Sequence, residues 1–168
     1  NNLSCQSTAM DPAFVHPAVI GVSALNADGI FASYSTAGAA NWIAAPGGEF
    51  GNNATYAGSG EGGPAIMTVD RETCNKGYVT SYMGSETVLN AFDDKGNHSN
   101  NASCNYTSTY QGTSAAAPMV SGVVALMLEA NPALTWRDVK HILATTAVQV
   151  HTGFSATAVN GVDYVGWI

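Results

Sequence analysis

Hydrophobic and polar residues divide the chain into three parts of different character. In the first part, residues 17–25 form an apolar run that ends at the turn-forming sequence Asn-Ala-Asp-Gly. A run of this length predicts a short strand covered on both faces, as in a parallel sheet. Residues 41–47 predict a second short strand, which ends at a Pro-Gly turn.

The middle part, residues 48–110, is rich in Gly, Asn, Ser and Thr. Two β-like pieces, residues 65–69 and 77–82, interrupt it. A structureless connection of this length is unusual inside a compact domain. We therefore predict an excursion built from small strands and loops.

The third part predicts two helices. Residues 114–130 are apolar on every face, which indicates a buried helix rather than an amphipathic one. Proline is tolerated near the first turn of a helix, so Pro118 indicates a helix that begins close to Ser114. A second helix, Trp136–Thr146, follows a sequence that matches a capping box, and residues 149–168 read as strand or loop.

Composition narrows the choice of partners. The chain has 168 residues, about one domain, of which 46% are hydrophobic and only 10% are charged. Its net charge of −7 disfavours nucleic acid and anionic membranes, and favours neutral or cationic partners. No uninterrupted apolar run reaches the roughly 18 residues of a membrane span, so none is expected.

The three cysteines are Cys5, Cys74 and Cys104, with no C-x-x-C pair that would indicate a zinc site. Cys74 and Cys104 share the polar middle part of the chain. One interpretation is a disulfide between them, which implies an oxidising compartment; the other leaves both as free thiols. In the first interpretation Cys5 would be unpaired or paired with a cysteine outside this chain.

A serine at the first turn of a buried helix lies near free backbone N–H groups and the positive end of the helix dipole. Ser114 could therefore support negative charge on a reacting acyl group, with its own N–H as a donor. An isolated Gly-Thr-Ser is also compatible with Ser114 acting as an ordinary helix cap.

The longer string GTSAAAP, followed by ALMLEANPALTWRDVKHIL, distinguishes these interpretations. It resembles the nucleophile segment of the subtilisin-like serine proteases, in the kexin/furin-like branch. The resemblance covers nearly the whole chain and is weakest over residues 50–100. It implies an α/β fold: part of a subtilisin-like three-layer sandwich, with a mostly parallel sheet and a buried nucleophile helix.

The resemblance implies peptide-bond hydrolysis through an acyl-enzyme on Ser114. The backbone N–H of Ser114 would contribute to the oxyanion hole, and the hydroxyl of Thr113 would assist there. Gly112 would let the substrate backbone approach closely. These three residues are the predicted catalytic and substrate-binding segment.

The family's general base and its carboxylate partner are not found in the chain. The base has a His-Gly-Thr context in this family, and none of the four histidines is followed by Gly-Thr: His16, His98, His141 and His151. We expect residues 1–168 to be a C-terminal portion of a catalytic domain that is inactive alone. It would self-associate or pair with the N-terminal portion that carries the histidine and aspartate.

Substrate preference and metal binding are further implications of the resemblance. Asp11 lies where the kexin-like branch has a carboxylate that receives a basic side chain of the substrate. In its Met-Asp-Pro context, Asp11 also fits an ordinary turn or helix-cap residue. The family binds structural calcium, but Thr36 replaces one acidic ligand, and the ligands in this chain are unknown. Glu49 lies near substrate-facing loops of the family. The parent protein is expected outside the cytoplasm, as an extracellular, secretory or periplasmic protein.

Two other functions compete with this one. The chain could be a noncatalytic binding or structural module derived from such a protease. Another acyl-transfer hydrolase would need its serine in a Gly-x-Ser-x-Gly elbow, which the Gly-Thr-Ser-Ala-Ala sequence does not match.

Overall fold

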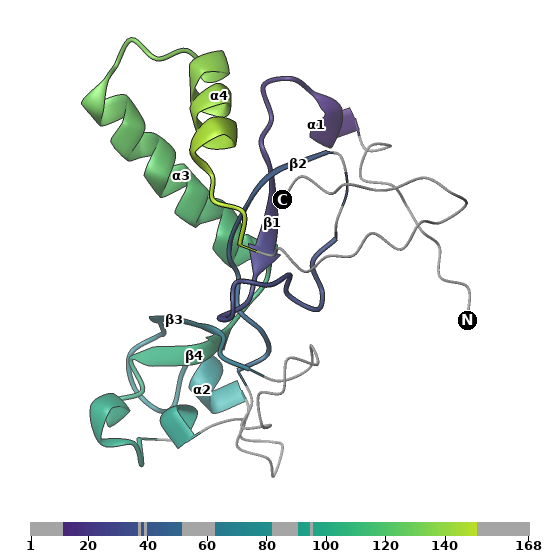
Figure 1. Ribbon diagram of the computed structural model, residues 1–168. Helices are drawn as coiled ribbons and strands as arrows, with labels where there is room; N and C mark the ends of the chain where they lie inside the picture. Colours follow the sequence, from purple (N-terminus) through teal and green to yellow (C-terminus); the bar gives the residue numbers. More distant parts are fainter. Residues whose placement is uncertain are drawn as a thin grey trace, which may run out of the picture.

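The computed structural model describes residues 12–36, 38, 40–51, 63–81, 91–94 and 96–150. Within them, two small sheets and two long helices form the main body (Figure 1). The elements in chain order are α1 (Pro12–Val15), β1 (Gly21–Leu25), β2 (Asn41–Pro46), β3 (Ile66–Val69), α2 (Tyr78–Ser81), the 3₁₀ helices η3 (Ala91–Asp93) and η4 (Ser99–Asn101), β4 (Tyr106–Tyr110), α3 (Thr113–Ala130) and α4 (Trp136–Thr146).

The strands β1 and β2 pair in parallel, as predicted from the apolar run and the Pro-Gly turn. Ala24 of β1 lies opposite Ala45 of β2, and both are buried. Small side chains here let α3 approach the sheet closely, through Ala116 and Val120. The remaining buried members of this core are Ala32, Val139 and Leu143.

Helix α3 is covered on one side only. It begins at Thr113, one residue before the predicted start, and buries only Ala115, Ala116 and Val120. The described residues leave apolar side chains exposed on its other side, at Met119, Val123, Leu126 and Leu128. An uncovered apolar face is expected for this helix when the N-terminal portion of the fold is not part of the chain.

By length and composition alone, α3 could also cross a membrane, with a mean hydropathy of 1.4 over 18 residues. The expectation of no such segment counted only uninterrupted apolar residues, whereas this helix includes Thr, Ser, Gly, Pro and Glu. Packing against the parallel sheet accounts for the apolar side of α3 that carries Ala116 and Val120, and the exposed apolar residues lie outside that contact.

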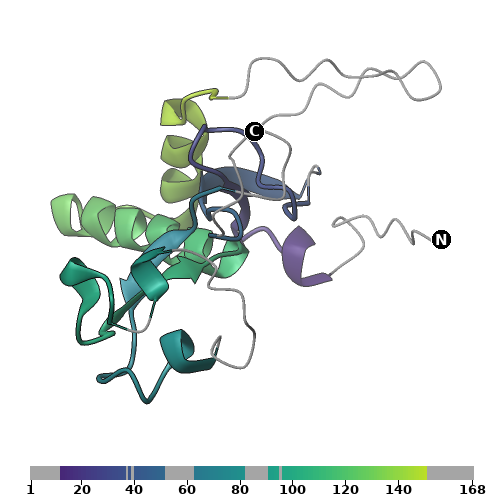
Figure 2. The same cartoon turned by 90° about the horizontal axis from the view of Figure 1, so that it is seen from below.

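Helix α4 has the predicted bounds and the predicted capping box. Thr135 accepts a hydrogen bond from the N–H of Asp138, and the Asp138 carboxylate accepts one from the N–H of Thr135. The helix folds back beside α3 (Figures 1 and 2) and contacts β2. The capping-box sequence was therefore sufficient to predict where this helix begins.

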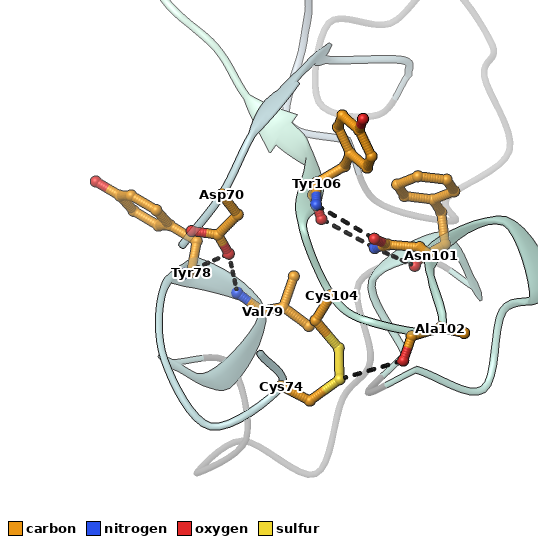
Figure 3. The surroundings of a disulfide bond; sticks show 9 residues. Asp70, Cys74, Tyr78, Val79, Asn101, Ala102, Cys104 and Tyr106 are labelled. Atoms are coloured by element: carbon orange, nitrogen blue, oxygen red, sulfur yellow. Dashed lines mark hydrogen bonds between the residues drawn. A yellow bond between two sulfur atoms is a disulfide. The ribbon is translucent and has the colours of Figure 1, made fainter. Parts of the chain in front are cut away.

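The middle part forms a second, antiparallel sheet from β3 and β4 (Figure 1). Strand β4 was not predicted, because its polar sequence Tyr-Thr-Ser-Thr-Tyr lacks an apolar run. Cys74 and Cys104 form a disulfide, with a Cα–Cα distance of 4.9 Å (Figure 3). The excursion of small strands and loops is thus confirmed, and the disulfide closes it.

One β-like piece of this part is helical instead. The sequence Tyr-Val-Thr favours a strand, but Tyr78 begins the short helix α2. The Asp70 carboxylate accepts hydrogen bonds from the N–H groups of Tyr78 and Val79, at 2.8 and 3.1 Å (Figure 3). A residue eight positions away therefore stabilises the first turn and overrides the local β preference.

Candidate active site

The Gly112–Ser114 segment lies where β4 leads into α3. Gly112 precedes the helix with φ 114° and ψ 169°, a backbone conformation that disfavours other residues. It lets the chain turn from the strand directly into the helix. Thr113 and Ser114 then occupy the first turn, and both are exposed.

Ser114 is not a helix cap, because the capping position belongs to Gly112 and no side chain caps there. Within the described part of the chain, neither the hydroxyl nor the backbone N–H of Ser114 has a hydrogen-bond partner. Both groups are free to meet a ligand at the positive end of the helix. Such a site suits a carbonyl oxygen that gains negative charge.

Tyr34 connects this segment to the corner that follows β2. Its hydroxyl accepts a hydrogen bond from the N–H of Gly112 at 2.9 Å. The same hydroxyl lies 2.7 Å from the carbonyl oxygen of Gly48 and 2.9 Å from that of Gly47, and its single proton serves these two acceptors. Sequence reasoning missed this residue, because only the fold brings these segments together.

The environment keeps the Tyr34 phenol protonated. Burial raises its pKa above the ordinary value, and the nearby Glu49 carboxylate raises it further. The hydrogen bond from Gly112 lowers the pKa, but by less than burial raises it. At neutral pH the phenol therefore remains able to donate to a carbonyl.

Glu49 is a supporting residue rather than one that faces a substrate. Its side chain is fully buried, and its two oxygens accept hydrogen bonds from the N–H and the hydroxyl of Ser33, at 2.9 and 2.8 Å. Because Ser33 directly precedes Tyr34, the buried carboxylate fixes the turn that carries the tyrosine. The expectation that Glu49 lies near substrate-facing loops stays a prediction.

Two of the described histidines, His16 and His98, have local structural roles. His16 accepts a hydrogen bond from the N–H of Ala18, and His98 caps η4 through the N–H of Asn100. His141 is exposed on α4. No hydrogen bond joins any of the three to Ser114 within the described residues, and His151 lies outside them.

Two predicted features remain outside the described site. Asp11 is not among the described residues. Among those that are, no group of three or more His, Cys, Asp or Glu side chains could hold a metal ion. Asp70 and Asp93 accept hydrogen bonds from backbone N–H groups instead. The described carboxylates thus do not fit the predicted calcium site.

The sequence profile of the subtilase family matches residues 1–164. The chain belongs to the subtilase family. The predicted family is thereby confirmed for nearly the whole chain. The individual roles of Asp11, Gly112, Thr113 and Ser114 stay predictions.

Related proteases match different lengths of this subtilase chain. An extracellular serine protease of Aeromonas sobria is 36% identical over 148 residues, covering 88% of the chain and 22% of that protease. A microbial serine proteinase of Aeromonas salmonicida is 32% identical over 164 residues, covering 94% of the chain and 23% of that proteinase. Human proprotein convertase subtilisin/kexin type 6 is 50% identical over 58 residues, covering 34% of the chain and 6% of that convertase. The chain thus spans less than a quarter of the length of the Aeromonas proteases.

Solved structures agree with the fold prediction. The crystal structure of the Aeromonas sobria serine protease has a TM-score of 0.62 and 38% identity, covering 76% of this subtilase chain and 19% of that one. The same protease in complex with a chaperone has a TM-score of 0.56 and 36% identity, again covering 76% of this chain and 19% of that one. The predicted α/β, partial subtilisin-like architecture is therefore confirmed.

Proposed function

We propose that residues 1–168 form part of the catalytic domain of a serine endopeptidase, with Ser114 as the nucleophile. The supporting observation is an exposed serine on the first turn of α3, whose hydroxyl and N–H have no partner among the described residues. The hydroxyl oxygen would attack the peptide carbonyl carbon and form an acyl-enzyme, with release of the amine. The Ser114 N–H would donate to the oxyanion.

Thr113 and Gly112 would serve the same step. The Thr113 hydroxyl would assist at the oxyanion, and Gly112 would leave space for the substrate backbone. Since Gly112 has φ 114°, a side chain there would strain the turn as well as obstruct the substrate.

A serine hydroxyl needs a general base to become an effective nucleophile. We propose that the histidine and its carboxylate partner belong to a portion of a longer protein outside these 168 residues. The isolated chain would then be inactive. The apolar side of α3 left open by the described residues would pair with that portion or with a second copy.

The substrate would be a peptide or protein cleaved after a basic residue, with Asp11 as the carboxylate that receives the basic side chain. The net charge of −7 supports a cationic partner. The Cys74–Cys104 disulfide supports an oxidising, extracellular or secretory setting. Calcium binding elsewhere in the longer protein remains a prediction of the family resemblance.

Covalent labelling with a fluorophosphonate tests this function. We expect the longer protein to be labelled at Ser114 and the Ser114→Ala variant to remain unlabelled. The isolated 168-residue chain should show neither labelling nor peptidase turnover. Labelling of the isolated chain at Ser114 would refute its inactivity. A longer protein that binds peptides without labelling or turnover would instead support the noncatalytic module.

A further inference from the structure

Tyr34 lies at the junction of the two backbone segments that meet beside Ser114. Gly112, two residues before the serine, directs its N–H to the Tyr34 hydroxyl at 2.9 Å and to the Gly47 carbonyl at 3.1 Å. These are the interactions through which the Gly47–Gly48 corner holds the turn into α3. The shared N–H makes the position of the turn depend on the phenol.

The close approach of the two segments leaves no room for side chains. A Cβ atom added at Gly47 would lie 2.9 Å from the Tyr34 hydroxyl and 3.0 Å from the Gly112 carbonyl oxygen. Gly48 has φ 70° and would meet the backbone of Ala65. The corner is therefore shaped to bring backbone atoms, rather than side chains, against the phenol and the turn.

The tyrosine is itself held from two other directions. Ser33, its chain neighbour, is bound through both its N–H and its hydroxyl to the fully buried Glu49. Phe50 packs edge-on against the ring, with the ring centroids 6.1 Å apart. A buried carboxylate that binds its chain neighbour and an aromatic contact thus support the ring in the position from which its hydroxyl reaches Gly112, Gly47 and Gly48.

We propose that Tyr34 is a positioning residue for Ser114. It does not touch the reacting atoms; its hydroxyl fixes the Gly112 peptide and thereby the direction of the Ser114 hydroxyl and N–H. This role rests on the proposed function, because it presumes that Ser114 is the nucleophile. A small displacement of a nucleophile is costly, since reacting atoms must be held within a narrow range of geometry.

The first test measures the contact itself in the 168-residue chain. Tyr34→Phe removes the hydroxyl and keeps the ring. We expect the amide hydrogen of Gly112 to exchange about fivefold faster or more, because its remaining acceptor is the longer bond to Gly47. The control Tyr78→Phe makes the same chemical change at an exposed residue of α2 and should leave Gly112 unchanged. Unchanged exchange in Tyr34→Phe overturns the proposal.

The second test measures function in the longer protein. We expect Tyr34→Phe to lower kcat about five- to tenfold with KM nearly unchanged, and to slow fluorophosphonate labelling of Ser114 equally. Lys140→Met, which weakens a distant contact of α4, controls for general loss of stability. A normal kcat in Tyr34→Phe overturns the positioning role and leaves the proposed function standing. The same holds if kcat falls equally in Lys140→Met. An inactive, unlabelled wild-type protein overturns the proposed function, and the positioning role with it.

Discussion

The hydroxyl of Tyr110 lies 3.4 Å from the carbonyl oxygen of Ser114 and donates a long hydrogen bond to it. In a regular helix this carbonyl accepts the N–H of the residue four positions later, but that residue is Pro118, which has none. The weak hydrogen bond from the Tyr110 hydroxyl, at the end of β4, thus replaces the missing helical hydrogen bond to the Ser114 carbonyl. The first turn of α3 therefore lacks one helical hydrogen bond at the residue proposed as the nucleophile.

Replacement of Pro118 by alanine should restore the missing hydrogen bond. We expect the free energy of unfolding to rise by about 1–2 kcal/mol, since the cost of proline inside a helix exceeds its effect on the unfolded chain. Urea denaturation followed by circular dichroism measures the change. Tyr110→Phe should cost less than about 1 kcal/mol in the wild type and nothing in Pro118→Ala. An equal cost in both backgrounds would show that the Tyr110 hydroxyl acts elsewhere.

Elements with local signals could be predicted from the sequence, and α4 is the clearest case. Thr135 and Asp138 complete the capping box from within the same turn, so no distant residue was needed to place the helix. Pro118 similarly restricted the predicted start of α3 to within one residue of the observed start. The Gly-Thr-Ser segment belongs to this group, because its motif is contiguous.

Features that depend on distant residues could not be predicted in the same way. Tyr78 begins a helix rather than a strand because Asp70 binds its N–H. Tyr34 reaches Gly112 across 78 positions, which no pattern of neighbouring residues indicates. The resemblance placed Glu49 near substrate-facing loops, and only the fold shows that its side chain is buried and that Ser33 donates to both of its oxygens.

Reduction of the Cys74–Cys104 disulfide should destabilise the chain. The bond closes a loop across 30 positions, which corresponds to about 3–4 kcal/mol in the chain-entropy description. We expect the denaturation midpoint to fall when a reductant is added. The double variant Cys74→Ser with Cys104→Ser should begin at the lower midpoint and respond no further. A reductant effect that persists in this variant would assign it to another part of the protein.

The Asp70 carboxylate should make stability depend on acid pH. Partial burial raises its pKa, but the N–H groups of Val79, Tyr78 and Arg71 outweigh burial and hold the pKa below its ordinary value. A group with a lowered folded pKa stabilises the protein above its unfolded value, about 3.9, and this contribution is lost as pH falls through the folded pKa.

Asp70→Asn should therefore be less stable than the wild type at neutral pH. Below about pH 4 the variant should lose less of its own stability than the wild type loses, because it has no carboxylate to protonate at this position. Denaturation midpoints between pH 2 and 7 measure both effects. Asp28→Asn removes the same charge from an exposed turn residue and should reproduce neither effect. Parallel pH profiles for Asp70→Asn and the wild type would contradict this interpretation of the α2 cap.

Lys140 should contribute more to stability than its position on a surface helix indicates. Its ammonium lies 4.2 Å from the ring centroid of Trp42 and donates to the carbonyl oxygens of Pro17 and Val19, each at 3.0 Å. The Trp42 indole in turn donates to the Lys140 carbonyl at 2.8 Å. These bonds join α4 to β2 and to the segment before β1.

Lys140→Met retains the apolar stem and removes the charge, so we expect the free energy of unfolding to fall by about 1–2 kcal/mol. Arg137→Met is a matched control, because Arg137 also lies 4.2 Å from a ring centroid, that of Trp136, but within its own helix. Its loss should be smaller, about 0.5 kcal/mol, since it joins no second element. Equal losses in the two variants would show that the carbonyl bonds of Lys140 contribute nothing beyond the ring contact.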